Sequence, residues 1–426
     1  MLLYWLMNNQ VEFAKRYPIY TALALAFGAA IALGISRFAY TLFLPLMRAD
    51  LDWSYLTAGN MNTGNAIGYF LGALICPWIF DRCQLRYVIL GAVFVTVFLV
   101  ATLGFLISAE MIFTIRLLVG ITSALIFISG GILAAQLSEL HPNQSGWILG
   151  IYYGGVGLGI FLASILVNPI EMFASKQGYS HAWQFSWIGM ALIASLLMLL
   201  MIKPIGSFYI LEISTPKSEM IAISKSIWMN LGYLLFGIGH IGYMTFVIAF
   251  LKEVGLETST VSSFYALLGL CLMVSSRLWS TMLDRYRGGE VLAIVNGIMG
   301  LACLIPALIV ILLGQVGQND LLIVIIFISG MLFGLAFITA VSSTTAFIKH
   351  NYPVTQWSGG IRLFTILFAI GQMLGPLMIG YIADYGGGLV VGLIVSGVIL
   401  FLGSFSALQQ RPLKTLNITK PSRWIT

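Results

Sequence analysis

Twelve long apolar stretches constrain this chain more than any other feature of its sequence. An α-helix needs about 20 apolar residues to cross a bilayer, and lipid-exposed backbone must be helical when it cannot close into a barrel. Most connections between the stretches are short, so consecutive helices should run antiparallel. We therefore predict an all-α membrane protein with twelve transmembrane helices. The predicted spans are 19–46, 55–79, 87–107, 111–137, 146–168, 183–202, 228–250, 259–283, 291–314, 320–346, 358–383 and 388–408.

The composition supports a protein that lies mostly in lipid. Charged residues make up 8% of the 426 residues and hydrophobic residues 59%, whereas an ordinary soluble domain carries about 25% charged residues. The net charge of +6 is dispersed along the chain and forms no dense basic run. This argues against nucleic acid as a partner. The cysteines lack the spacing of a metal site, and we expect no metal and no cofactor.

The spans divide into two halves of six helices. The longest connection, 203–227, separates an N-terminal bundle (1–202) from a C-terminal bundle with a short tail (228–426). The pair Asp81-Arg82 closes the second span, and Asp284-Arg285 closes the eighth. Duplicated halves of this kind commonly form a substrate site near the middle of the membrane.

The loop charges predict the orientation of the chain. Fourteen Lys and Arg residues fall in segments on the side of the termini, and only Arg48, Lys176 and Lys252 fall in loops on the other side. Positive loop residues favour the cytoplasmic side. We predict a multi-pass protein with both termini and the 203–227 linker in the cytoplasm.

Several motifs resemble those of the major facilitator superfamily. Asp81, Arg82 and Arg86 fit its loop motif after the second span, and Asp284, Arg285, Arg287 and Gly288 form a second copy. Arg116, Gly120 and Ala124 fit its fourth-span motif. The first-span segment Gly34-Ile-Ser-Arg37-Phe38-Ala-Tyr40 and the eleventh-span residues from Gly359 to Arg362, with Gly371-Gln372 and Gly375-Pro376, are similar to the bacterial YbfB/YjiJ-like branch.

The resemblance implies two six-helix bundles that move around a central site in a bacterial inner membrane. It implies transport but no particular substrate. We expect a monomer whose partners are a small-molecule substrate and the lipid bilayer. Gating of the cytoplasmic face is assigned to the loop and span-end charges Asp81, Arg82, Arg86, Arg277, Asp284, Arg285 and Arg362.

Four arginines remain inside predicted spans, and all 15 acidic residues fall in loops or at span ends. A buried charge is costly in a membrane and faces a partner or a cavity. Arg37 and Arg116 are predicted at similar depth in spans that line one cavity in the superfamily. Their guanidinium groups suit capture of a carboxylate or phosphate. The alternative is that Arg116 braces the fold by bonding to helix carbonyl groups.

The other two arginines lie nearer the cytoplasmic side. Arg277 precedes Asp284 by seven residues, so both should lie on one helix face. Arg277 and Arg362 are assigned to a gate or to snorkelling toward the interface.

Uncharged polar and aromatic residues complete the candidate site. Asn62, Asn65 and Tyr69 share one face of the second span, although they could equally form interhelical hydrogen bonds. The whole predicted set comprises Arg37, Tyr40, Asn62, Asn65, Tyr69, Arg116, Tyr152, Tyr153, His240, Tyr243 and Gln372.

The leading functional hypothesis is a secondary transporter for a small organic anion, for which a proton would be the simplest coupling ion. His240 is the one histidine inside a span, and an imidazole changes charge near pH ~6.5. The main alternative is proton-driven efflux of a drug or a siderophore-like compound, for which an embedded acid would be expected. A membrane sensor without transport is a remote alternative. We expect no enzymatic activity, because the spans contain no arrangement of catalytic side chains.

Overall fold

The computed structural model describes residue 14 and residues 16–206, 223–314 and 319–413. In this part of the chain the regular elements are all helical, and twelve runs are long and apolar enough to cross a membrane. The predicted fold class is therefore confirmed. The elements are α2 Pro18–Ala29, η1 Ala30–Phe38, α3 Tyr40–Asp50, α4 Tyr55–Phe80, α5 Leu85–Leu103, α6 Ala109–Leu140, η2 Pro142–Gln144, α7 Ser145–Lys176, α8 Trp183–Gly206, η3 Ile223–Ser226, α9 Ile227–Glu253, α10 Thr258–Leu278, α11 Ser280–Arg285, α12 Glu290–Leu313, α13 Asp320–Asn351, α14 Val354–Tyr385 and α15 Gly388–Leu408.

Polar side chains mark where several helices begin. The Ser54 hydroxyl accepts a hydrogen bond from the Thr57 N–H, and the Asn319 side chain accepts from the Leu321 and Leu322 N–H groups. Such caps satisfy N–H groups that have no partner within their own helix. At the other end of α12, Gly314 adopts a φ of 78°, which a glycine adopts without strain.

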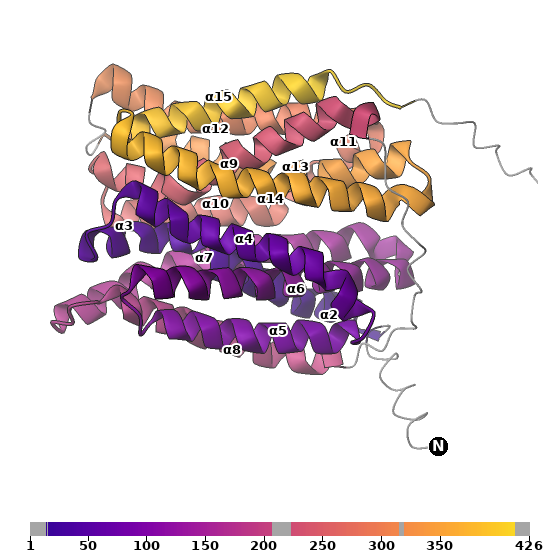
Figure 1. The fold of residues 1–426 in the computed structure, drawn as a ribbon, viewed down its shortest axis with the longest axis horizontal. Coiled ribbons are helices and arrows are strands. Elements are labelled where there is room, and N and C mark those ends of the chain that lie inside the picture. Colours follow the sequence, from indigo (N-terminus) through magenta and orange to yellow (C-terminus); the bar gives the residue numbers. More distant parts are fainter. Residues whose placement is uncertain (1–13, 15, 207–222, 315–318, 414–426) are drawn as a thin grey trace, which may run out of the picture.

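Two groups of helices lie side by side (Figure 1). One group contains α2 to α8, and the other contains α9 to α15. We call the end at which α2 begins and α15 finishes the terminal end, and the opposite end the distal end. Much of the predicted linker lies outside the described residues. The two halves meet where α4 packs on α14, α7 on α10 and α3 on α9.

Small residues allow these helices to approach closely. A Cβ atom added to Gly157 would lie 2.3 Å from the Gly269 carbonyl oxygen, and one added to Gly59 would lie 2.5 Å from the Pro376 carbonyl oxygen. Packing of backbone on backbone is how membrane helices associate without a hydrophobic driving force. The interface between the halves is therefore built from backbone contact as well as side chains.

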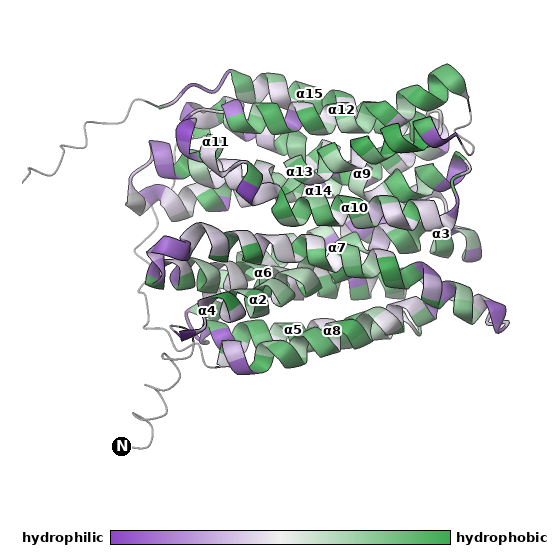
Figure 2. Ribbon diagram, turned by 180° about the vertical axis from the view of Figure 1, so that it is seen from behind, coloured by the Kyte–Doolittle hydropathy of each residue, from purple (hydrophilic) through white to green (hydrophobic). Residues whose placement is uncertain are grey.

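The surface matches a lipid environment. Hydrophilic residues gather at the ends of the helices, and apolar residues cover their length (Figure 2). Large apolar side chains such as Phe98 and Phe405 are exposed along α5 and α15. On a soluble protein such a surface would be an aggregation liability, whereas here it faces the acyl chains.

Two spans depart from the continuous α-helices that the sequence predicted. The first span contains a nine-residue π-helix, η1, in which the Ala39 N–H donates to the Gly34 carbonyl oxygen at 2.8 Å. The eighth span breaks at Trp279, where α10 ends and α11 begins. The expectation that one continuous helix carries both Arg277 and Asp284 was therefore wrong, because Trp279 interrupts it.

Candidate functional site

Arg37 lies in η1, at the boundary between the two halves, and only 2% of its surface is exposed. Its Nη2 atom donates a 2.8 Å hydrogen bond to Oε1 of Gln372 on α14. Its Nε atom is buried and has no hydrogen-bond partner among the described residues. The rings of Tyr69 and Phe38 lie 5.5 and 5.8 Å from the guanidinium carbon. A buried cation is thus held by a neutral amide and by aromatic faces.

Gln372, which accepts from Arg37, also contacts His240 on α9. The Gln372 Nε2 atom lies 3.4 Å from the His240 Nε2 atom, and His240 Nδ1 lies 2.6 Å from the Phe236 carbonyl oxygen. A carbonyl oxygen only accepts, so Nδ1 carries the ring hydrogen and Nε2 presents its lone pair to the Gln372 amide. The sequence singled out all three residues, and the structure brings them into one chain of contacts.

Three phenylalanines surround the His240 ring. Phe236, Phe337 and Phe368 have ring centroids 4.4, 5.1 and 5.3 Å from it, and the planes are within 23° of parallel. The three residues come from α9, α13 and α14. Apart from its bond to the Phe236 carbonyl oxygen, the imidazole therefore meets one polar group, the Gln372 amide, and is otherwise packed against apolar rings.

Arg116 on α6 is bonded differently from Arg37. Its Nε donates to the Met61 carbonyl oxygen at 2.9 Å, its Nη1 to the Ser36 carbonyl oxygen at 3.4 Å and its Nη2 to Asn62 Oδ1 at 3.1 Å. Its guanidinium carbon also lies 4.1 Å from the centre of the Tyr40 ring. These contacts tie α6 to α4 and η1 within one half. They match the bracing alternative that the sequence left open.

The predicted polar face of α4 divides between two roles. Asn62 Nδ2 donates to Thr245 Oγ1 across the halves at 2.7 Å, and Asn65 Nδ2 donates to the Arg116 carbonyl oxygen at 3.1 Å. Both amides therefore make interhelical hydrogen bonds. Of the three residues on this face, Tyr69 is the one whose ring contacts Arg37.

The remaining predicted tyrosines have contacts within their own halves. The Tyr152 hydroxyl donates to the Phe127 carbonyl oxygen at 2.5 Å, and the Tyr153 ring packs against Tyr152 at 5.1 Å. Tyr243 stacks on Phe333 at 4.3 Å. The Tyr40 hydroxyl donates to the Ala58 carbonyl oxygen at 2.9 Å. These hydroxyl groups and rings stabilise helix packing around the site.

The predicted gating residues lie at the terminal end. The Arg277 guanidinium carbon lies 3.5 Å from the Trp147 ring centre on α7, so this contact crosses the halves. Arg82 stacks on Trp78, and Arg86 donates to the Gly206 carbonyl oxygen, both within the first half. The other four, Asp81, Asp284, Arg285 and Arg362, are exposed.

The distal end contains a cluster between the halves that the sequence did not single out. Asp384 accepts from the Tyr55 and Leu56 N–H groups, and the Tyr55 hydroxyl bonds to Glu253. The Arg48 guanidinium carbon lies 3.8 Å from the Tyr55 ring centre. The sequence did offer one signal for this cluster. Asp384 and Glu253 lie at the ends of their spans, on the same side of the membrane as the start of α4.

Further side-chain hydrogen bonds join the halves between the middle of the molecule and the distal end. Thr41 donates to the Met244 carbonyl oxygen, Thr63 to that of Met373 at 3.1 Å, and the Tyr265 hydroxyl to that of Phe38 at 2.8 Å. Together with the distal cluster, these bonds hold the two halves in contact between Arg37 and the distal end.

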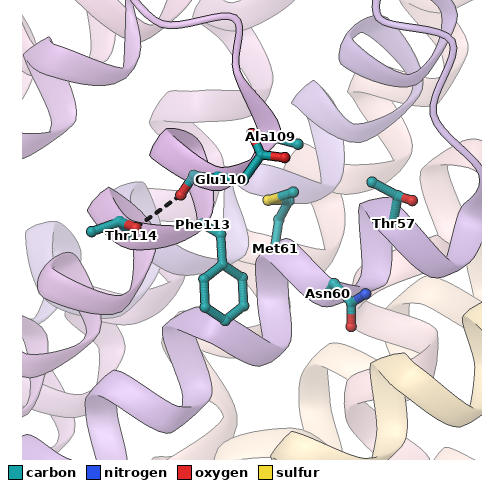
Figure 3. Close-up of a pocket in the computed structure, with 7 residues that line it drawn as sticks. All are labelled: Thr57, Asn60, Met61, Ala109, Glu110, Phe113 and Thr114. Atoms are coloured by element: carbon teal, nitrogen blue, oxygen red, sulfur yellow. Dashed lines mark hydrogen bonds between the residues drawn. The ribbon is translucent and has the colours of Figure 1, made fainter.

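A separate hollow of about 540 Å³ lies near the distal end between α4 and α6 (Figure 3). None of the predicted site residues lines it. Met61, which lines the hollow, nevertheless accepts a hydrogen bond from Arg116 through its carbonyl oxygen. Its lining residues are Thr57, Asn60, Met61, Ala109, Glu110, Phe113 and Thr114.

Residues 29–408 match the family described as "Uncharacterised MFS-type transporter YbfB". The chain belongs to this family. The resemblance predicted from the first and eleventh spans is therefore confirmed, and this protein is an MFS transporter in a membrane. A curated relative, "Uncharacterized MFS-type transporter YceJ" of Bacillus subtilis (strain 168), is 24% identical over 67% of this chain and 72% of its own length.

Solved transporters share the fold of this protein. A variant of the nucleoside transporter NupG superposes with a TM-score of 0.67 at 13% identity, covering 91% of this chain and 99% of its own. A bacterial homologue of the human lysosomal transporter Spinster, inward-facing and occupied, gives 0.68 at 18% identity, covering 93% and 96%. At these identities the likeness concerns the fold, and the substrate has to be argued from the site.

Proposed function

We propose that this protein is a secondary active transporter that moves a small organic anion across the bacterial inner membrane by alternating access. The observation that supports this most directly is Arg37, a buried guanidinium between the halves that is bonded to a neutral amide. A buried cation without a counter-charge is costly. An anion that replaces the amide would therefore gain a strong, charge-assisted contact.

Alternating access requires that the two halves, 1–202 and 228–426, rock around Arg37. The distal cluster would open when the terminal end closes, and Asp81, Arg82, Arg86, Arg277, Asp284, Arg285 and Arg362 would form the gate on the cytoplasmic side. Both termini are then cytoplasmic. A coupled proton would offset the charge of the anion, with His240 as its carrier.

The alternative is proton-driven efflux of a drug or siderophore-like compound. The aromatic rings around His240 could hold such a molecule, and they support this alternative. The sequence has no acid deep within a span, whereas a carrier for cationic drugs would be expected to use one. A membrane sensor without transport is less well supported, since the relatives with named functions are transporters.

A thermal-shift screen of the purified protein tests the substrate class. A ligand that binds the folded state raises the melting temperature with its concentration. We expect stabilisation by small carboxylates such as acetate or benzoate and none by tetraphenylphosphonium. The screen should be repeated on Arg37→Lys, which keeps the charge but loses the planar donor group, and on the exposed control Arg287→Lys.

Loss of the anion response in Arg37→Lys, with the response intact in Arg287→Lys, would support the proposal. An undiminished response in Arg37→Lys would refute Arg37 as the anion site. Stabilisation by lipophilic cations and by no anion would instead favour efflux of drug-like compounds.

A further inference from the structure

We propose that the Gln372 amide occupies, in the empty carrier, the place of the substrate's carboxyl group, and that the substrate is a monocarboxylate bound together with one proton. This inference rests on the proposed function, because it takes Arg37 as the anion site. It adds the number of carboxyl groups, the proton stoichiometry and a specific role for Gln372.

The hydrogen-bonding pattern of the Gln372 amide leads to this inference. Its oxygen accepts from Arg37 Nη2 at 2.8 Å, and its nitrogen faces the lone pair of His240 Nε2 at 3.4 Å. The amide thus presents one acceptor to one half and one donor to the other half. A carboxyl group with one proton has the same pattern, with a carbonyl oxygen as acceptor and an O–H group as donor.

A carboxylate without that proton would not fit. One of its oxygens would accept from Arg37, but the other would face the unprotonated Nε2, and two acceptors cannot bond to each other. A proton placed on His240 Nε2 removes the conflict. The carboxylate then accepts from Arg37 and from the imidazolium. The one new covalent bond is the N–H bond formed at Nε2 with a proton from solution, so one anion enters with one proton.

The surroundings of His240 leave this proton few other destinations. The ring packs against Phe236 of its own helix, Phe337 of α13, and Phe368 and Gln372 of α14. The charged side chain of Arg37 in η1 is linked to it through Gln372. None of these side chains can accept a proton in preference to the imidazole or the substrate.

The bonding of Arg116 limits the substrate to one carboxylate. All three of its nitrogen atoms already donate to Met61, Ser36 and Asn62. A second carboxylate would thus find no unbonded guanidinium beside Arg37. The side chains around His240 are apolar rings, so we expect an apolar body on the substrate. A phosphate or a dicarboxylate would leave charge uncompensated against these rings.

The same contact explains how the empty protein can close. Gln372 and Arg37 are 335 residues apart and belong to different halves. Without substrate, the amide satisfies a guanidinium that would otherwise be buried without a partner. Gln372 is therefore expected to support return of the empty carrier, a step that a symporter needs and an exchanger does not.

Gln372→Ala provides a direct test, because the substitution removes a fragment equivalent to acetamide. We expect millimolar acetamide and acetate each to raise the melting temperature of this variant by several degrees, as small polar fragments can bind a site of their own size. Neither should do so in the double variant Arg37→Lys with Gln372→Ala. The control Gln136→Ala removes a half-buried amide on α6 that belongs to no part of the site.

Acetate and acetamide should differ in their pH dependence. Acetate needs the added proton, so its affinity for Gln372→Ala should rise by up to about tenfold for each unit that the pH is lowered. Acetamide carries its own donor hydrogen, so its affinity should stay nearly constant between pH 5.5 and 8. Equal pH profiles for the two probes would overturn the assignment of the proton.

Failure of acetamide and acetate to stabilise Gln372→Ala beyond Gln136→Ala would overturn the stand-in role. If anions still bind the parent protein through Arg37, the proposed function survives that result. If Gln372→Ala does not fold, Gln372→Glu provides the test. This variant protein should fold at low pH, and its own carboxyl group should occupy the acetate site and abolish the acetate response. A retained acetate response in Gln372→Glu would refute the proposal.

Discussion

Asp384 caps the first turn of α4 at Tyr55, although 329 residues separate the two in sequence. Its carboxylate oxygens accept from the N–H groups of Tyr55 and Leu56, each at 2.8 Å. A carboxylate at a helix N-terminus is stabilised by the unpaired N–H groups and by the helix dipole. Because α4 and α14 belong to different halves, this cap also holds the distal ends of the halves together.

Replacing the cap should loosen the distal end. We expect Asp384→Ala to populate conformations in which the distal ends of α4 and α14 are further apart, since the cap is worth about 0.5–2 kcal/mol. Spin labels on Asp52→Cys and Tyr385→Cys, in a background without native cysteines, would report the distance. Asp320→Ala is the control, because Asp320 also lies in the first turn of a helix, α13, which belongs to the second half. An unchanged distance distribution in Asp384→Ala would show that the cap does not hold the halves together.

Substitution by lysine should rank the two buried arginines in one order for stability and in the reverse order for anion binding. Arg116→Lys loses a three-way set of hydrogen bonds, and each buried acceptor left unsatisfied costs about 1–3 kcal/mol. We expect a clear fall in melting temperature for Arg116→Lys and a small one for Arg37→Lys, which loses a single bond. Anion binding should follow the reverse order among the folded variants. A larger loss of stability in Arg37→Lys would reverse the assigned roles.

Close packing of α4 on α6 should tolerate no added side chain at Gly68. A Cβ atom there would lie 1.9 Å from the Leu117 carbonyl oxygen, so the helices would have to separate. We expect Gly68→Ala to destabilise the protein by about 1–3 kcal/mol. Gly150→Ala on α7 is a matched control, because no atom lies within 4 Å of its Cβ position. Its effect should be neutral or stabilising by up to about 1 kcal/mol. Equal melting temperatures for the two variants would contradict the contact.

His240 should account for the pH dependence of carboxylate binding. We expect His240→Gln to fold normally and to bind benzoate with an affinity that changes little between pH 5.5 and 8. In the parent protein the affinity should rise as the pH falls, because binding takes up a proton. His181→Gln is the control, since His181 pairs with Asp50 at the distal end. A pH profile identical to that of the parent would remove His240 from the mechanism and favour uniport or sodium coupling.

The predicted orientation can be tested with reporter fusions. Fusions at Gln10, Lys217 and Lys414 should report the cytoplasm, and a fusion after Glu253 should report the outside, because basic loop residues favour the cytoplasmic side. Reporter activity that depends on location gives the measurement. An external signal at Lys217 would contradict the arrangement of six helices before the linker and six after it.

The sequence predicted the spans well because the length of an apolar stretch is set by the thickness of the bilayer. Arg37, Gln372 and His240 also stood out, since polar groups inside apolar stretches are few. Their mutual contact could not be predicted, because it joins helices that are hundreds of residues apart. The balance between the two roles of Arg116 likewise depended on which carbonyl groups the fold placed around it.

The distal cluster was missed for a related reason. An acid at the end of a span, such as Asp384, reads as an ordinary interfacial charge. Its role as a cap depends on which helix begins opposite it, and that is a property of the packed halves. The π-helix was missed because its residues, Ala30 to Phe38, carry no local signal that distinguishes them from an α-helix of the same composition.

The π-helix makes the length of the first span as important as its residues. A π-helical turn bonds residue i to i+5 and so contains one residue more than an α-helical turn. If the turns of η1 stay π-helical, deleting a single residue rotates all that follows by nearly a quarter of a turn relative to what precedes it, because a π-helical turn holds more residues than the roughly 3.6 of an α-helical turn. Thr41 would turn away from Met244, and Tyr40 from Arg116. In evolutionary terms, we expect substitutions in this segment to be accepted more readily than any change in its length.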